Sequence, residues 1–194
     1  MKKNITFIIT VLIACIGAVS SDIYTPSVPS IAHLFNVPLS TVQLSMAIFM
    51  GGYAFSQLFY GPFSEVVGRR KTLFLGLIIL MLGSLICILA PNMEWLLFGR
   101  LIQGLGAGGG SLFRAIFRDS FEGAELAKYG SYATMMVTFV VPAAPALGGL
   151  LQQHFNFRAS FIFILTYAIV ATVMAAFWLQ EKNQHRHKER SKLS

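Results

Sequence analysis

Two charged residues interrupt long apolar stretches of the sequence. Asp22 follows the apolar run 5–19, and Arg100 lies inside the apolar run that begins near Met93. A carboxylate within a membrane span is costly and usually serves a function; burial favours its protonated form, which suits Asp22 to reversible protonation. A guanidinium stays charged, so a buried Arg100 needs hydrogen-bond acceptors or a water-filled cavity. Asp22 and Arg100 are therefore the first candidates for a polar functional site.

Helical geometry places both residues at a similar depth. At about 1.5 Å per residue, Arg100 lies roughly 10 Å below the outer surface and Asp22 roughly 8 Å from the end of its helix. Gln103 shares a helix face with Arg100, because residues three apart are neighbours on a helix. The spacing predicts a cluster of Asp22, Arg100 and Gln103. Two alternatives stay open: Asp22 is a helix-end acid in interfacial water, or Arg100 extends its long stem outward to the interface.

The composition indicates an integral membrane protein. The chain is 55% hydrophobic and 12% charged, whereas soluble domains are about 45–50% apolar and about 25% charged. The net charge of +7 follows from basic residues that flank membrane spans, so we expect no nucleic-acid partner. Cys15 and Cys87 lie within apolar stretches and are expected to pack as small hydrophobes, without a metal or disulfide role.

Six apolar stretches are each long enough for a spanning helix of about 20 residues. We expect an all-α membrane protein with one six-helix bundle over residues 1–179 and a charged cytoplasmic tail at 180–194. A mixed-charge cytoplasmic loop is expected at 118–129. The expected helices cover about 5–28, 39–60, 72–90, 93–117, 130–151 and 160–179.

The basic residues predict the orientation of this bundle. Of the 15 Lys and Arg residues, Arg158 falls on one side of the expected membrane and Arg100 within it, which leaves thirteen on the other side. Because basic loops stay in the cytoplasm, we expect both termini to be cytoplasmic.

A charged turn connects the second and third expected helices. It contains Gly61, Glu65 and Gly68, followed by the basic cluster 69–71. Glycines at such a turn permit unusual backbone conformations and close approach of the helix ends. We therefore expect a tight loop on the cytoplasmic side.

Two small-residue segments predict close helix packing. The stretch 104–110 matches G-x-G-x-x-G, but an apolar helix surrounds it, so a dinucleotide site is not expected. Its pairs Gly104/Gly108 and Gly106/Gly110 are instead spaced as G-x-x-x-G. In the fifth expected helix, the small-residue segment 142–149 predicts a bend and tight contact, through Pro145, Gly148 and Gly149.

Four motifs together resemble one family. They are Asp22-x-Tyr-x-Pro26, Gln57-Leu-Phe-Tyr-Gly-Pro62 with the Gly61 to Arg70 loop, Arg100-x-x-x-Gly104 with Arg118-Asp119, and Ala144-Pro-x-x-Gly-Gly149. The chain resembles the amino-terminal half of the drug:proton antiporters of the major facilitator superfamily. Within these, it is most similar to the bicyclomycin-resistance (Bcr/CflA-type) branch.

The resemblance implies a 3+3 inverted repeat and alternating access, with substrate near the midplane between two six-helix halves. It implies that Asp22 is a protonation site and that Arg100, Gln103 and Tyr24 belong to the coupling and substrate region. It also implies a conformational latch formed by Gly61, Glu65, Gly68, Arg69 and Asp119, with Arg69 and Asp119 as partners.

The same resemblance implies an efflux transporter of the bacterial inner membrane. The expected partners are a drug-like small molecule, protons and lipid, with the proton gradient as energy source and no cofactor. Family members have twelve spans and this sequence has six. We therefore expect the isolated chain to be an inactive remnant, or to pair with a second six-helix half.

A membrane enzyme or a non-transporting scaffold is the competing class. No Ser, His and carboxylate pattern supports catalysis, and the pair His185 and His187 is too sparse for a metal site. We therefore expect no enzyme activity, whereas a scaffold role stays open.

Overall fold

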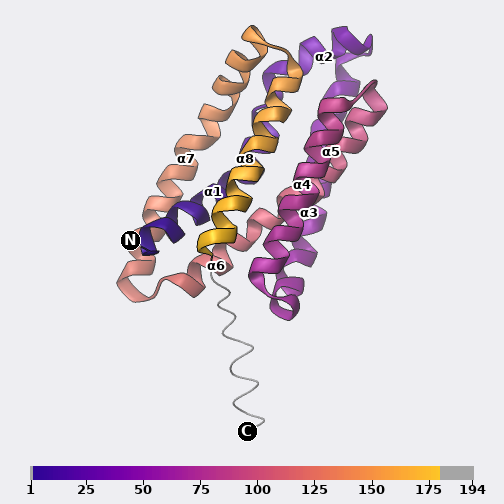
Figure 1. Ribbon diagram of the computed structural model, residues 1–194. Coiled ribbons are helices and arrows are strands. Elements are labelled where there is room, and N and C mark those ends of the chain that lie inside the picture. The colour runs from indigo at the N-terminus through magenta and orange to yellow at the C-terminus, as the bar shows by residue number, and fades with distance from the viewer. Residues whose placement is uncertain (1, 180–194) are drawn as a thin grey trace.

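The computed structural model describes residues 2–179 of the 194-residue chain, and these residues form a bundle of helices (Figure 1). Two short 3-10 helices, η1 and η2, interrupt the α-helices. In order, the elements are α1 (Lys2–Asp22), η1 (Thr25–Ser27), α2 (Val28–Phe35), α3 (Leu39–Val67), α4 (Arg69–Leu89), α5 (Met93–Ala107), η2 (Gly108–Leu112), α6 (Phe113–Ser120), α7 (Gly123–His154) and α8 (Phe157–Trp178).

The first expected helix, at 5–28, is divided in the structure. α1 ends at Asp22, and η1 and α2 continue the path to Phe35. Pro26 and Pro29 each lie in the first turn of the element they begin, where the missing backbone N–H is tolerated. The prolines therefore restart the chain as new helical segments instead of ending it. Asp22 lies at the resulting junction, at the last residue of α1.

The turn between α3 and α4 is shorter than the sequence suggested. The α3 helix continues through Pro62 to Val67, beyond the expected end near 60, and α4 begins at Arg69. Gly68 alone separates them, with φ of 112°. Because L side chains rarely adopt this conformation, glycine is needed at this position.

The expected helix at 93–117 is also divided. α5 ends at Ala107, and the three consecutive glycines Gly108 to Gly110 begin the 3-10 segment η2. Each glycine in a helix costs about 1 kcal/mol relative to alanine, which favours a change of helix type here. α6 follows and extends to Ser120.

The expected loop at 118–129 is mostly helical. Only Phe121 and Glu122 separate α6 from α7, which begins at Gly123 rather than near 130. The last expected helix, at 160–179, begins earlier, at Phe157, because the Asn156 side chain accepts a hydrogen bond from the Arg158 backbone N–H at 2.9 Å. The expected tail at 180–194 lies outside the described residues.

Contacts between distant segments define the two ends of the bundle. At one end Tyr129 Oη donates to Asn4 Oδ1 at 3.4 Å, and Arg70 Nη2 donates to the Ala176 carbonyl at 2.6 Å. At the other end Gln152 Nε2 donates to Ser30 Oγ at 2.9 Å. The start of α1, the α3–α4 turn and the end of α8 thus share one end, at the lower part of Figure 1.

The outer surface of the bundle is strongly apolar. Four segments in the described part are long and apolar enough to cross a membrane: Asn4–Phe35, Arg69–Leu89, Gly123–His154 and Phe157–Trp178. In the most apolar stretch of Gly123–His154, only 11% of the residues are buried. An apolar exterior of this extent indicates a lipid-facing surface. The crossing of the membrane by α3 and by the α5–α6 segment stays a prediction.

Candidate functional site

Arg100 of α5 is fully buried near the centre of the bundle. Its Nη1 donates to the Ser20 carbonyl of α1 at 2.9 Å and to Gln103 Oε1 at 2.5 Å. Within the described residues, its Nε and Nη2 have no hydrogen-bond acceptor. A buried cation with unsatisfied N–H groups is costly, so other contacts must hold it in place.

Three aromatic rings surround this guanidinium. Its Cζ lies 4.2 Å from the ring centre of Phe49 in α3, 4.8 Å from that of Tyr24 and 6.0 Å from that of Phe161 in α8. Cation–π contacts are worth up to about 2 kcal/mol or more when desolvated. The rings therefore take the place of part of the missing hydrogen bonding.

Polar partners extend the cluster in two directions. Gln103 Nε2 donates to Ser84 Oγ of α4 at 2.8 Å. Tyr24 Oη lies 2.7 Å from Ser45 Oγ, and the Ser45 hydroxyl donates to the Val42 carbonyl at 2.6 Å. Because the only hydroxyl hydrogen of Ser45 is used there, Tyr24 is the donor to Ser45.

Asp22 lies beside this cluster. It is partly buried, it accepts a hydrogen bond from the Ser21 hydroxyl, and it interacts electrostatically with Arg100. Among the described residues, no hydrogen bond or ion pair joins Asp22 to Arg100. The structure therefore gathers Arg100, Gln103 and Tyr24 in direct contact and places Asp22 next to them.

The second group of expected residues lies at the α3–α4 turn. Arg69 Nε is 2.5 Å from Asp119 Oδ2 of α6, and both side chains are largely buried. Glu65 and Gly61 line the same polar pocket as this pair. Gly61 differs from the expectation of close approach: it lies within α3, and a Cβ there would meet no atom within 4 Å.

Some of the expected packing glycines make close contacts. A Cβ on Gly104 would collide with the Phe49 carbonyl, one on Gly108 with the Ser56 hydroxyl, and one on Gly148 with the Ile23 carbonyl. Gly149 differs, because a Cβ there would meet no atom within 4 Å. Pro145 lies inside the continuous helix α7 and is partly buried.

The glycines of α5 and η2 face more than one neighbour. Gly106 packs against the Leu80 backbone of α4, whereas a Cβ on Gly110 would lie 3.0 Å from the Ile13 carbonyl of α1. The two G-x-x-x-G pairs therefore let three different helices approach this segment.

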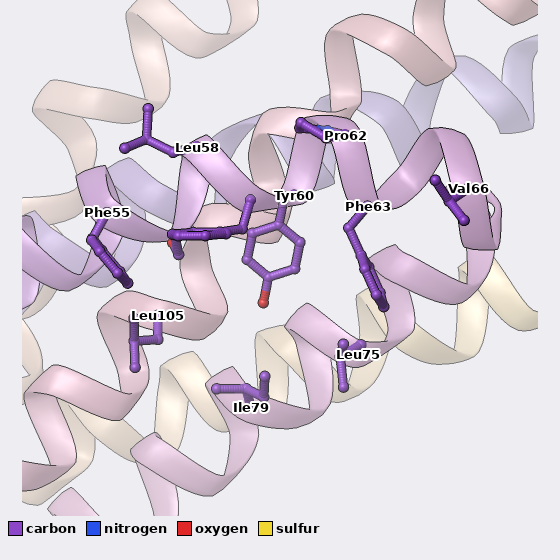
Figure 2. Close-up of a pocket in the computed structure, with 11 residues that line it drawn as sticks. Phe55, Leu58, Tyr60, Pro62, Phe63, Val66, Leu75, Ile79 and Leu105 are labelled. Atoms are coloured by element: carbon purple, nitrogen blue, oxygen red, sulfur yellow. The ribbon is translucent and has the colours of Figure 1, made fainter.

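An apolar groove runs along the outer side of α3, α4 and α5. Its volume is about 600 Å³. Figure 2 shows Phe55, Tyr60 and Phe63 of α3 on one side, and Leu75, Ile79 and Leu105 on the other. This groove lies apart from the Arg100 cluster and has almost no polar lining, so it offers a surface for apolar contact rather than a site for proton chemistry.

Sequence reasoning missed several contacts of the site. Phe49 and Phe161 carry no signal, because they are two of 17 phenylalanines and the sequence does not say which rings meet Arg100. Nothing in the sequence marks Ser84 as the partner of Gln103 or Ser45 as the partner of Tyr24. Helical spacing relates Arg100 only to residues of its own helix, and both serines lie on other helices.

The arrangement places one carboxylate, that of Asp22, beside the enclosed cation of Arg100. Within the described residues, no group of three or more His, Cys, Asp or Glu side chains could hold a metal ion.

Comparison with known proteins gives consistent results. The sequence profile described as Major Facilitator Superfamily matches residues 10–194. The chain is 33% identical over 182 residues to Multidrug resistance protein D of Escherichia coli (strain K12), covering 93% of this chain and 46% of that protein. It is 37% identical over 174 residues to the MFS-type transporter YdgK of Bacillus subtilis (strain 168), covering 88% of this chain and 43% of that protein.

A solved structure shares the fold. The human organic anion transporter MFSD10 (TETRAN) matches with a TM-score of 0.65 and 18% identity, covering 93% of this chain and 48% of that one. The chain thus spans about half the length of the curated relatives it matches. With nearly its full length matched by the family profile, this chain belongs to the Major Facilitator Superfamily, a family of integral membrane transporters that are not enzymes.

Proposed function

We propose that this chain forms one half of a proton-coupled efflux transporter for drug-like small molecules. Within the superfamily we assign it to the drug:proton antiporters of the bicyclomycin-resistance type, on the four motifs that carry Asp22, Arg69, Arg100 and Pro145. The proposal places it in the inner membrane of a bacterial cell with both termini cytoplasmic. Its energy source is the proton gradient, and it uses no cofactor.

The observation that carries the proposal is the environment of Arg100. Its Nε and Nη2 lack acceptors among the described residues, and the Asp22 carboxylate is close enough to interact electrostatically. Ionised Asp22 attracts the guanidinium, whereas protonated Asp22 does not. Protonation of Asp22 therefore changes how strongly Arg100 is held toward α1, and this change supplies the coupling step of the proposal.

The α3–α4 turn supplies the second part of the mechanism. The Arg69–Asp119 pair fixes the turn to α6, and Arg70 holds the end of α8 through the Ala176 carbonyl. Two adjacent arginines thus tie one turn to two other elements. We propose that these contacts form in one transport state and release in the other, and that Glu65 and Gly68 belong to the same latch.

A second six-helix half completes the transport path in this proposal. The chain covers 46% of Multidrug resistance protein D, and α3 and α7 expose large apolar side chains along their length. In folds of this kind the substrate lies near the membrane midplane between two repeats. The alternative function is a remnant or scaffold without transport. It is favoured if no second six-helix half assembles with this chain.

The test is dye efflux in inverted membrane vesicles that contain this chain together with the carboxyl-terminal half of Multidrug resistance protein D. Co-purification of the two halves establishes assembly. We expect dye movement that depends on the proton gradient and stops when an ionophore collapses it. Asp22→Asn should abolish this movement without loss of assembly, whereas Glu94→Gln, which alters an exposed acid of α5, should retain it.

The result that contradicts the proposal is equally specific. If the two halves co-purify and the Asp22→Asn assembly moves dye with wild-type dependence on the gradient, Asp22 is not the coupling residue. If assembled halves move no dye from a panel of cationic, neutral and anionic compounds, the efflux proposal is wrong.

A further inference from the structure

A polar pocket of about 500 Å³ lies between the end of α3 and the η2–α6 segment. It adjoins the Arg69–Asp119 pair. The α3–α4 turn and α6, which carry this pair, lie at the lower end of the bundle in Figure 1. The pocket is distinct from the Arg100 cluster, which is buried among the helices. It also lies on a different side of α3 from the apolar groove, because α3 turns Gln57 and Ser64 toward it and Phe55 and Phe63 toward the groove.

The pocket carries an excess of positive charge. Three guanidinium groups, those of Arg69, Arg114 and Arg118, line it together with the two carboxylates of Glu65 and Asp119. Arg69 is paired with Asp119. Three positive and two negative charges leave a net charge of +1, which favours an anionic ligand.

Hydrogen-bond donors in the pocket face the same space. Arg114 and Arg118 are four residues apart, so they lie one turn apart on one face of α6. Arg118 Nε donates to the Arg114 carbonyl at 3.4 Å, so the Arg118 side chain extends along α6. The Arg114 guanidinium lies over the Phe113 ring, with its Cζ 5.6 Å from the ring centre.

Neutral groups complete the donor set. Gln57 of α3 and Ser111 of η2 line the pocket and can each donate a hydrogen bond. The hydroxyl of Ser64 is already used, because it donates to the Gly61 carbonyl at 2.7 Å. The available donors therefore come from both sides of the pocket, from α3 and from η2–α6.

We propose that this pocket binds the phosphate group of an anionic ligand. The planar, multi-donor guanidinium groups of Arg114 and Arg118 match the oxygens of a phosphate, and Ser111 and Gln57 supply further donors. The phosphate has two sources at this end of the molecule: a soluble phosphate ester, or the headgroup of an anionic phospholipid. In either case the ligand bridges α3 and α6 beside the Arg69–Asp119 pair.

The proposal does not depend on transport, so it is tested by binding. The full chain is purified and placed in nanodiscs of phosphatidylcholine, and thermal unfolding is followed as glycerol 3-phosphate or inorganic phosphate is added. Sodium chloride at equal ionic strength corrects for general salt effects. A second set of nanodiscs contains phosphatidylglycerol in place of part of the phosphatidylcholine. A ligand that binds the folded state raises the unfolding temperature.

Two double variants make the test specific. Arg114→Gln/Arg118→Gln removes the proposed phosphate contacts, and Lys71→Gln/Lys128→Gln removes two exposed charges outside the pocket. We expect the first variant to need a ligand concentration about tenfold higher or more for half of the effect, because it removes the charge-assisted hydrogen bonds to the phosphate. The lysine variant should respond like the wild type.

Each outcome decides the proposal. Stabilisation by glycerol 3-phosphate in phosphatidylcholine identifies a soluble ligand, and stabilisation by phosphatidylglycerol alone identifies a lipid headgroup; both require loss in the arginine variant. Arg114→Lys/Arg118→Lys keeps the two positive charges, so it should retain part of the rise in unfolding temperature. That result would show that the pocket itself is intact in the arginine variants. The proposal is overturned if chloride raises the unfolding temperature as much as phosphate does, or if neither the soluble ligands nor phosphatidylglycerol raise it. It is also overturned if Lys71→Gln/Lys128→Gln loses the effect to the same extent as Arg114→Gln/Arg118→Gln.

Discussion

Arg100 makes contact with more helices than any of the polar residues described beside it. It reaches the Ser20 carbonyl of α1, Gln103 of its own helix and the rings of Phe49 in α3 and Phe161 in α8. Removing a charge from water costs several kcal/mol, so these contacts must together offset a large penalty. The Arg100 side chain therefore joins α1 to three other helices.

The first prediction concerns Gln103, which accepts from Arg100 and donates to Ser84. Gln103→Leu should lower the free energy of unfolding by about 1–3 kcal/mol, because it removes an acceptor from a buried cation. Unfolding in mild detergent measures this, and Gln153→Leu on the exposed surface of α7 is the matched control. Equal effects of the two substitutions would show that the network around Arg100 contributes nothing to stability.

The second prediction separates the two roles of Tyr24. Tyr24→Phe retains the ring over Arg100 and loses the hydrogen bond to Ser45, so it should cost about 0.5–1.5 kcal/mol of stability. Tyr24→Leu also loses the cation–π contact and should cost about 1–2 kcal/mol more. If both variants unfold at the same denaturant concentration, the ring contact has no energetic role.

The sequence identified part of this cluster for a clear physical reason. Charged and amide groups in apolar runs are conspicuous, so Asp22, Arg100 and Gln103 could be selected, and helical spacing joined the last two. The aromatic contacts could not be predicted, because they come from helices whose relative rotation depends on packing. The same limit applied to Asp22, whose depth was predicted but whose hydrogen-bond partner was not.

At the scale of the elements, proline and glycine caused the main differences from expectation. The segment 5–28 and the segment 93–117 were each expected as one helix, and each is divided where prolines or consecutive glycines occur. The expected loop 118–129 is largely helical, because its Ala, Glu, Leu and Lys residues favour helix and the apolar runs alone did not reveal it. Hydropathy located the long helices but not their ends.

The third prediction compares two glycines of different packing. Gly104→Ala should destabilise the chain by about 1–3 kcal/mol, because the added Cβ would displace the Phe49 carbonyl and move α3 away from α5. Gly149→Ala should be neutral or stabilise by up to about 1 kcal/mol, since it adds a better helix former in open space. Thermal unfolding of the two variants side by side checks this, and the reverse order would contradict the packing described for α5.

The fourth prediction concerns the attachment of α6. Asp119→Ala removes the pair with Arg69, whose side chains are 17% and 16% exposed, and ion pairs that reach solvent contribute about 0.2–1 kcal/mol. Amide hydrogen exchange in α6 should therefore accelerate by up to about fivefold, while exchange in α8 stays unchanged. Glu122→Ala, which alters a neighbouring exposed acid, is the control. Acceleration spread evenly over all helices would indicate a general loss of stability and not a released latch.

At the scale of the whole molecule, the polar and apolar surfaces have different distributions. The exterior carries large exposed apolar side chains on α3 and α7, whereas the Arg100 cluster is enclosed and Asp22 is only partly covered. The groove along α3 in Figure 2 adds a further apolar surface. A transporter in which substrate passes between two halves requires such surfaces to be covered by the other half or by lipid.

The proposed pairing with a second half is tested most directly by measuring mass and transport on one sample. Native mass measurement in mild detergent gives the oligomeric state of the chain, and efflux from vesicles made with the same preparation gives its activity. We expect a monomer without transport, and transport only where two six-helix halves are present in one assembly. A stable monomer that exports a drug-like dye against a gradient would contradict the claim.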